Sequence, residues 1–406
     1  MYCRCLFAIT IVFCLLGIWD DGQAQEAKKQ GARKVNTEDI HELASWPQKA
    51  DLIEALLKRG ENVEAINSKG QTPLQIAAAN GLWNICDVLL RNGANSNGRG
   101  KIDITPLMLV AKSTLFKYEP EAGDNLKATA QLLLKNGANV NAQQGIGWTP
   151  LCYAAYYSGN HQIVKLLLES GANSRLAAND ESTPAHFAAS QGFEDIVRTL
   201  IASGVSPNSR NKEGATVLFW AIRGCSSALV GELIDRGADP SMPNKSGMLP
   251  LHLAVLDKNI ETVRLLLERG VDINAVGALE NTAVSVAVRT GNAELVKVLL
   301  DYKPNLNTRD NTGNTPLHGA VQNQNIQMTR ELVKAGADVS LGHRDDGSTA
   351  LHMAVAIQNA EIAKFLIDQG ASPNVKNSLG YSPMDIAVEK QDEKIIEILK
   401  SSTTRK

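Results

Sequence analysis

A unit of about 33 residues recurs along nearly the whole chain, and this repetition constrains the fold more than any other feature. One copy begins at Asn311 with turn-forming residues, among which Gly313 is free to take a positive φ. Thr315 suits an N-cap, and Pro316 suits the first helical position because its missing N–H costs nothing there. A second helical segment follows, which Gly336 is suited to end. Each unit is therefore predicted to be a turn followed by two short helices.

The first helix of each of ten copies starts at the same position of the unit, which a capping residue usually occupies. These starts are Thr72, Thr105, Thr149, Thr183, Thr216, Leu249, Thr282, Thr315, Thr349 and Ser382. Successive steps are 33, 44, 34, 33, 33, 33, 33, 34 and 33 residues, so the spacing is constant apart from one insertion. Such a period predicts a solenoid, in which each unit contacts its neighbours and no single large core is needed.

The run Thr-Pro-Leu-His-x-Ala from Thr315 to Ala320 and the closing Gly336-Ala337 resemble the ankyrin repeat. The resemblance covers about residues 36–402. It implies an all-α solenoid of stacked helix-turn-helix units with projecting β-turn fingers, acting by recognition of other molecules. It also implies a structural role for the capping threonines and for the histidine three residues later, which bonds the threonine and the backbone. These positions include Thr72, Thr105, Thr149, Thr183, His186, His252, Thr315, His318 and His352.

The array is predicted to end in two capping units and to contain one softer region. Residues 38–60 look like a degenerate first helix pair, and the last unit, with Ile395 to Leu399, is predicted to be polar outside and apolar within. Leu249 has no hydroxyl to cap its helix, Glu280 replaces a turn glycine and Lys303 replaces a stop glycine. Residues 249–305 are therefore expected to be less stable than the units that follow.

The first 24 residues have the composition of a secretory signal peptide. A short segment with one positive charge precedes Cys5 to Trp19, which is apolar and carries no charge. Small residues then favour cleavage between Ala24 and Gln25. Residues 25–35 are expected to form a flexible leader, and residues 403–406 a short tail. The sequence thus predicts a secreted or periplasmic protein.

Two other interpretations of the N-terminus remain open. An uncleaved anchor is one, although the apolar run is shorter than the roughly 20 residues that span a bilayer. Lipidation at Cys14 is the other, although bulky Phe13 stands before it. After signal removal Cys86, Cys152 and Cys225 remain, and small buried hydrophobic side chains are a better interpretation than a bridge or a reactive thiol.

Composition and motifs give no sign of catalysis, a metal, a cofactor or nucleic-acid binding. The net charge of −2 lacks the basic excess of a nucleic-acid-binding protein. The stacked histidines make a metal ladder conceivable, but no unit adds a ligand beside one at metal-binding spacing. No zincin, P-loop or nucleophile-elbow motif is present. Asn244 stands in a glycosylation sequon whose use the sequence does not decide.

One unit carries aromatic residues at positions that, by register, are expected to face the surface. Trp148 precedes a capping threonine, Tyr156 and Tyr157 end the first helix, and Tyr153 lies one turn earlier. The inserted loop, around residues 113–125, is expected to lie beside that helix end. We predict a partner-binding patch, because Trp and Tyr dominate binding hot spots. It consists of Trp148, Tyr153, Tyr156, Tyr157, Phe116 and Tyr118. The alternative is that the loop folds over these aromatics and buries them as a local core.

The sequence therefore predicts a non-enzymatic, monomeric scaffold that binds a protein partner through its concave face after export. A secreted membrane-active or toxin-like protein is an alternative, although toxins that resemble long ankyrin arrays carry a separate apolar module, which this chain lacks after residue 24. Regulation or protection of a co-exported enzyme is a narrower form of the scaffold hypothesis. The sequence selects no particular partner.

Overall fold

The computed structural model describes residues 39–119 and 121–403. The predicted signal peptide, its cleavage site at Ala24 and Gln25, the leader and residues 404–406 of the tail lie outside this part of the chain. Within it, the protein consists of short helices and turns, with isolated β-bridges at Arg210–Thr216 and Gly342–Thr349 in place of strands. The prediction of an all-α fold is confirmed.

The helices of the described residues form eleven pairs, each with an inner helix followed by an outer one. The inner helices are α3 (Ile40–Leu43), α5 (Pro73–Ala79), α7 (Pro106–Lys112), α9 (Pro150–Tyr153), α11 (Pro184–Ser190), α13 (Val217–Gly224), α15 (Pro250–Leu256), α17 (Ala283–Arg289), α19 (Pro316–Gln322), α21 (Ala350–Ala356) and α23 (Pro383–Glu389). The outer helices are α4 (Ala50–Lys58), α6 (Trp83–Arg91), α8 (Ala122–Lys135), α10 (His161–Glu169), α12 (Glu194–Ala202), α14 (Ser227–Asp235), α16 (Ile260–Glu268), α18 (Ala293–Leu300), α20 (Ile326–Lys334), α22 (Ala360–Asp368) and α24 (Glu393–Thr403). Shorter segments are η1 (Pro47–Lys49), η2 (Leu115–Lys117), η3 (Ala154–Ser158) and η4 (Ala278–Glu280).

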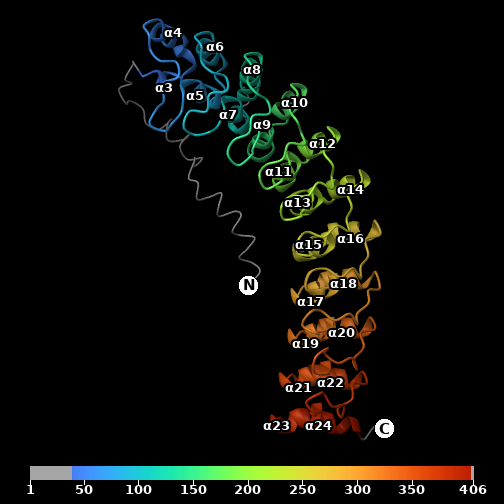
Figure 1. Cartoon of the computed structure of the whole chain (residues 1–406). Helices are drawn as coiled ribbons and strands as arrows, with labels where there is room; N and C mark the ends of the chain where they lie inside the picture. Colours follow the sequence, from blue (N-terminus) through green and yellow to red (C-terminus); the bar gives the residue numbers. More distant parts are fainter. Residues whose placement is uncertain (1–38, 120, 404–406) are drawn as a thin grey trace.

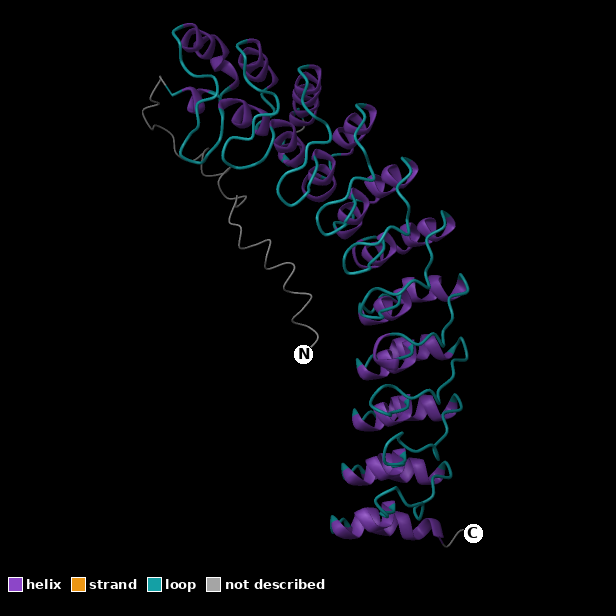
Figure 2. Ribbon diagram, in the orientation of Figure 1, coloured by secondary structure: helices purple, strands orange, loops and turns teal. Residues whose placement is uncertain are grey.

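The pairs stack in sequence order into a curved array (Figure 1). Inner helices such as α11 and α13 lie on the inner side of the curve, and outer helices such as α12 and α14 lie on the outer side (Figures 1 and 2). Each inner helix packs on the inner helix of the next pair, and most outer helices do the same. One continuous apolar core therefore runs through the stack, as expected of a solenoid.

Hydrogen bonds at the start of each inner helix explain why the helices begin where they do. The Thr315 hydroxyl accepts from the His318 N–H, and Nδ1 of His318 accepts from the Thr315 N–H at 3.3 Å. This reciprocal capping box recurs in most units, and in four of them Gln75, Met108, Ser285 or Asp385 takes the place of the histidine. The helix that starts after Leu249 has no side-chain cap, because leucine offers no acceptor.

The turns between pairs are joined to one another by main-chain hydrogen bonds. The Lys245 N–H donates to the Glu213 carbonyl at 2.9 Å, and the Ala278 N–H donates to the Gly247 carbonyl at 2.7 Å. The same bond recurs between most neighbouring turns and orders them into a row of fingers. Between two fingers a side chain replaces it, because the Asp103 carboxylate accepts from the Gly145 N–H at 2.7 Å.

The last helix pair differs from the predicted polar cap. Val388 is 57% exposed, whereas the residue at its register in each earlier motif-bearing unit is at most 2% exposed. Those buried equivalents are Ala78, Ala111, Ala155, Ala189, Ile222, Val255, Val288, Val321 and Val355. In every earlier unit the following inner helix covers this position, and no described element follows α24. The expectation that this unit is polar on its outer side is therefore wrong at Val388.

The region predicted to be softer contains several strained residues. Leu279, Glu280 and Lys303 have positive φ angles of 60°, 55° and 51°. In L-residues other than glycine this conformation costs roughly 1–2 kcal/mol. Two buried side-chain atoms in the same region, Nε2 of His252 and Oγ1 of Thr262, have no hydrogen-bond partner among the described residues. The lower stability of residues 249–305 stays a prediction.

Candidate protein-binding surface

Trp148 and Tyr153, two members of the predicted binding patch, lie in the core. They are 3% and 5% exposed, and their ring centroids are 5.3 Å apart in an edge-to-face arrangement. Trp148 also lies 4.6 Å from the ring of Phe187, which belongs to the next inner helix. The prediction that Trp148 and Tyr153 face the surface is therefore wrong. The residue before the capping threonine points toward the following unit, so a large apolar side chain there becomes part of the packing between units.

Tyr156 and Tyr157 remain half-buried at the end of the same inner helix. Their rings pack edge to face with centroids 4.9 Å apart, and Tyr157 stacks on the buried Tyr153 at 5.9 Å. The helix ends in a π-helical turn, η3, in which the Gly159 N–H donates to the Ala154 carbonyl at 3.1 Å. This turn accommodates the extra residue of the 34-residue step, and π-helical turns are frequent at functional sites.

The insertion contributes the two remaining members of the predicted patch. Phe116, in the short helix η2, is half-buried against the core, and Tyr118 is 73% exposed. The inserted segment is not all loop, because α8 has 14 residues whereas α6 has nine. Four of the six members of the predicted patch are thus exposed or half-buried, and the buried Trp148 and Tyr153 pack beneath them.

Two lysines connect the insertion to units further along the array. Lys112, at the end of α7, places Nζ 4.9 Å from the ring centroid of Tyr157. Lys117 places Nζ 5.6 Å from the ring of Phe193, which stands at the start of α12. Burial lowers the pKa of Lys112 below its ordinary value. We define the insertion patch by the side chains at this place: Lys112, Phe116, Lys117, Tyr118, Tyr156, Tyr157 and Phe193.

Phe193 reaches the patch because a glycine of the preceding unit leaves room for its ring. A Cβ atom added to Gly159 would lie 2.7 Å from the Phe193 ring. Gly159 has a φ of 66°, a left-handed conformation that glycine adopts without strain. No sequence motif marks Phe193 or either lysine as part of a surface site. The only signal was a phenylalanine at the position that Leu82 fills in an earlier unit.

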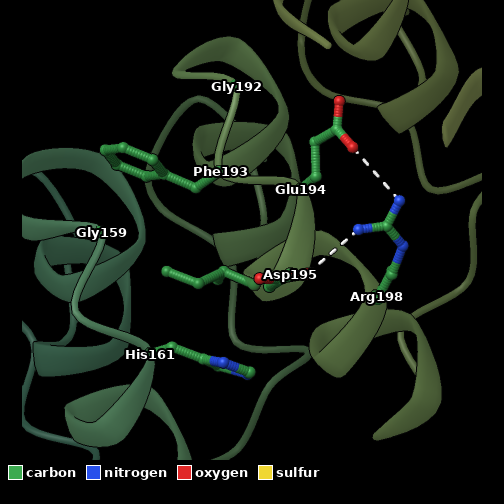
Figure 3. A pocket seen from close by; sticks show the side chains of 8 residues that line it. Gly159, His161, Gly192, Phe193, Glu194, Asp195 and Arg198 are labelled. Carbon is green, nitrogen blue, oxygen red and sulfur yellow. Dashed lines mark hydrogen bonds and ion pairs between the residues drawn. The ribbon is translucent and has the colours of Figure 1, made fainter. Parts of the chain in front are cut away.

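A groove of about 350 Å³ shares Phe193 with the patch (Figure 3). Arg198 pairs there with Glu194 at 3.1 Å and with Asp195 at 3.0 Å, and it also pairs with Glu232 of the next outer helix. One guanidinium thus faces three carboxylates, so the groove keeps an excess of negative charge. Its lining residues are Gly159, His161, Gly192, Phe193, Glu194, Asp195, Ile196 and Arg198.

The motif histidines are structural links between units. Nε2 of His318 donates to the Ser348 carbonyl of the next unit at 3.0 Å, and Nε2 of His352 donates to the Tyr381 carbonyl at 3.1 Å. Burial lowers the pKa of His186, His252 and His318 to about 4. The described residues contain no group of three His, Cys, Asp or Glu side chains placed to hold a metal ion.

The three cysteines that lie in the described residues are free thiols. Cys86 and Cys152 are fully buried, and Cys225 is half-buried. The Cys152 sulfur accepts a hydrogen bond from the Thr149 hydroxyl at 3.3 Å, in the place that histidine fills elsewhere. Burial raises the pKa of Cys152 to about 11. These thiols are neutral side chains, as expected of small buried hydrophobic residues.

The stacked helix pairs, the row of hydrogen-bonded fingers and the long inner surface define a solenoid scaffold, a class of protein that binds others along its length. Comparison with protein families agrees. Ankyrin repeats (3 copies) match residues 40–118, 121–211, 200–277 and 275–343, and ankyrin repeats (many copies) match residues 332–387. The chain belongs to the ankyrin-repeat family, whose repeats form protein–protein interaction scaffolds, and the matched families are not enzyme families.

Among solved structures, the chain is similar to the ankyrin repeat domain of Bcl-3, described as a unique member of the IkappaB protein family. The two share 29% sequence identity with a TM-score of 0.51. The similarity covers 54% of this chain and 99% of that chain. None of the curated proteins compared with the chain matches it. In the part of the chain that the structure describes, no helix is long and apolar enough to cross a membrane.

Proposed function

We propose that this protein is a non-enzymatic scaffold that binds a partner protein after export, and that the insertion patch is its main contact. The observation that carries this proposal is the change in side chains at the ends of the inner helices. Most units place small or polar residues there, such as Asn80 and Gln191. The fourth helix pair instead places Tyr156 and Tyr157 there, and the neighbouring insertion adds the exposed Tyr118.

The buried part of the aromatic cluster suits this role. Trp148 and Tyr153 hold Tyr157 from below, so little conformational freedom is left for it to lose on binding. A half-buried tyrosine with a fixed ring and a free edge supplies contact area at low entropic cost. The patch therefore has the composition of a binding hot spot, although only part of it is accessible.

Export rests on the N-terminal sequence. The apolar run up to Trp19 and the small residues up to Ala24 favour cleavage before Gln25. N-terminal sequencing of protein from the native host is expected to return a mature chain that begins at or near Gln25. An intact Met1 would contradict export by this route.

Site-directed photo-crosslinking tests the binding role. A photoreactive phenylalanine analogue replaces Tyr157 in one variant, and Gln131, exposed on the outer helix α8, in the control. The variants are incubated with the secreted or periplasmic proteins of the host. We expect one partner to be captured at position 157 and not at 131, and capture to be lost on competition with the wild-type protein. Equal capture at both positions, or none, would contradict the proposal.

The same preparation separates the alternatives. A membrane-active protein would release dye from liposomes, whereas a scaffold would not. Regulation or protection of a co-exported enzyme would appear as an enzyme among the captured partners, with altered activity or half-life in the complex. Release of dye at the protein concentration used for crosslinking would favour the toxin-like alternative.

A further inference from the structure

The two lysines of the insertion patch lie against aromatic rings. Arg330 lies over the Phe365 ring in the same way, but it also pairs with Glu361 at 3.8 Å. Arg198, Arg223 and Arg269 each pair with a carboxylate. Lys112 and Lys117 instead contact the rings of Tyr157 and Phe193. Within residues 39–119 and 121–403, neither lysine forms an ion pair. The patch thus holds two ammonium groups that form no direct ion pair with a carboxylate of the described residues.

Without a ligand, the Lys112 ammonium is partly removed from water and has no carboxylate partner, and this costs free energy. Its side chain is half-buried between the end of α7 and the Tyr157 ring, and burial is the cause of its lowered pKa. The face of an aromatic ring attracts a cation but accepts no strong hydrogen bond, so the ammonium keeps unused donors. A carboxylate placed beside it would accept those donors in a partly dehydrated setting, where such a bond is stronger than in water.

We propose that the insertion patch binds an acidic segment of a partner protein, in which carboxylates alternate with apolar or aromatic side chains. The carboxylates pair with Lys112 and Lys117, and the side chains between them pack against Tyr157, Tyr156 and Phe193. This inference rests on the proposed scaffold function and names the chemistry of its partner.

A peptide segment fits this patch better than an anionic membrane. Lys112 lies between a helix end and a ring, which an extended chain reaches and a flat bilayer does not. Membrane attraction takes roughly four to eight clustered basic residues. Nucleic acid is disfavoured by the net charge of −2, because nucleic-acid-binding domains carry a basic excess.

Fluorescence anisotropy with synthetic peptides tests the inference. The probe is a short labelled peptide in which glutamate alternates with phenylalanine, and the comparison peptide has lysine in place of glutamate. We expect the acidic peptide to bind the full chain and the basic peptide not to bind. The double variant Lys112→Gln with Lys117→Gln is expected to bind the acidic peptide about tenfold more weakly. Raised salt is expected to weaken binding to the wild type and to have less effect on the variant.

Two control proteins separate charge from folding. Lys112→Arg with Lys117→Arg keeps both charges over the rings and is expected to retain binding. Lys135→Gln removes an exposed lysine at the end of α8, away from both rings, and is expected to bind like the wild type. Equal binding of the acidic and basic peptides, or undiminished binding by the double Gln variant, would overturn the inference. Stronger binding to phosphatidylserine vesicles than to the peptide would also overturn it.

Failure of this inference is distinguishable from failure of the scaffold proposal. If position 157 captures a partner but the acidic peptide does not bind, the scaffold stands and the partner segment has a different chemistry. If neither occurs, the patch is not a binding surface.

Discussion

The ring of Trp148 lies 4.6 Å from the ring of Phe187 and joins one helix pair to the next. Trp148 also contacts Tyr153, Tyr156 and Tyr157. Its neighbours thus include side chains on both sides of a repeat boundary. The proposed binding patch rests on a buried tryptophan, so a substitution of Trp148 is expected to act on stability, whereas a substitution of an exposed member is expected to act on affinity.

Replacement of Trp148 by alanine is expected to destabilise the array rather than to weaken binding alone. Removing a fully packed tryptophan leaves a cavity and costs about 3–5 kcal/mol. Tyr118→Ala, at a side chain that is 73% exposed, is the matched control and is expected to change stability by less than about 0.5 kcal/mol. Urea unfolding followed by circular dichroism measures both. Equal stability of the two variants would show that Trp148 is not part of the packing.

Stability is expected to fall below pH 6.5 because the buried motif histidines resist protonation. In the folded protein the pKa of His186, His252 and His318 is about 4, which lies below the value near 6.5 expected in the unfolded chain. The neutral histidines therefore contribute stability that is complete above pH 6.5 and is lost as the pH falls toward 4. The loss is about 1.4 kcal/mol per pH unit for each histidine.

The variant His318→Gln tests this pH dependence. Gln75 provides a precedent at the same register, since its side chain accepts from the Thr72 N–H at 2.7 Å and donates to the Ile104 carbonyl at 2.6 Å. The variant is expected to fold at pH 7.5 and to lose about 1.4 kcal/mol less per pH unit below 6.5. The measurement is urea unfolding across this range. A pH profile identical to that of the wild type would contradict the assignment.

Lys303→Gly is expected to stabilise the array. Lys303 has a φ of 51° at the place where other units have glycine, and relief of this strain is worth about 1 kcal/mol. Gly270→Lys is the matched reverse change one unit earlier. An added Cβ at Gly270 would contact nothing within 4 Å, so only the φ of 82° opposes the lysine. The two variants are expected to shift the melting temperature in opposite directions.

Native-state hydrogen exchange is expected to divide the array at the softer region. Residues 249–305 include the uncapped start at Leu249 and the strained Leu279, Glu280 and Lys303. Because the stability of a repeat array is a sum of unit and interface contributions, these amides are expected to open at lower free energy than those of residues 310–400. Uniform protection on both sides of that boundary would contradict the expectation.

Val388 and Val355 occupy the same register and are expected to differ in their tolerance of a polar side chain. Val388→Gln is expected to change stability by less than about 0.5 kcal/mol, because the side chain is largely exposed. Val355→Gln buries an unpaired amide and is expected to cost about 2 kcal/mol or more. Thermal unfolding of the two variants measures the difference. A cost at Val388 similar to that at Val355 would indicate that an association covers the last unit in solution.

The sequence by itself determined the features that depend on a few adjacent residues. Thr315 and Pro316 start a helix because an N-cap acceptor and a missing N–H act within one turn. Gly336 ends the next helix because its φ of 101° excludes most other residues. Ten copies of such local signals fix the period, and the period fixes the stack.

Only the tertiary structure decided which side chains of the insertion region reach the surface. Trp148 is buried because Phe187 of the next unit lies against it, and Val388 is exposed because no described unit follows it. Lys117 meets Phe193 because the insertion reaches past the fourth helix pair. Each of these outcomes depends on the packing between units, where the partner of a side chain is set by curvature and stacking rather than by its neighbours in sequence. The position of a residue within its own unit does not specify that packing.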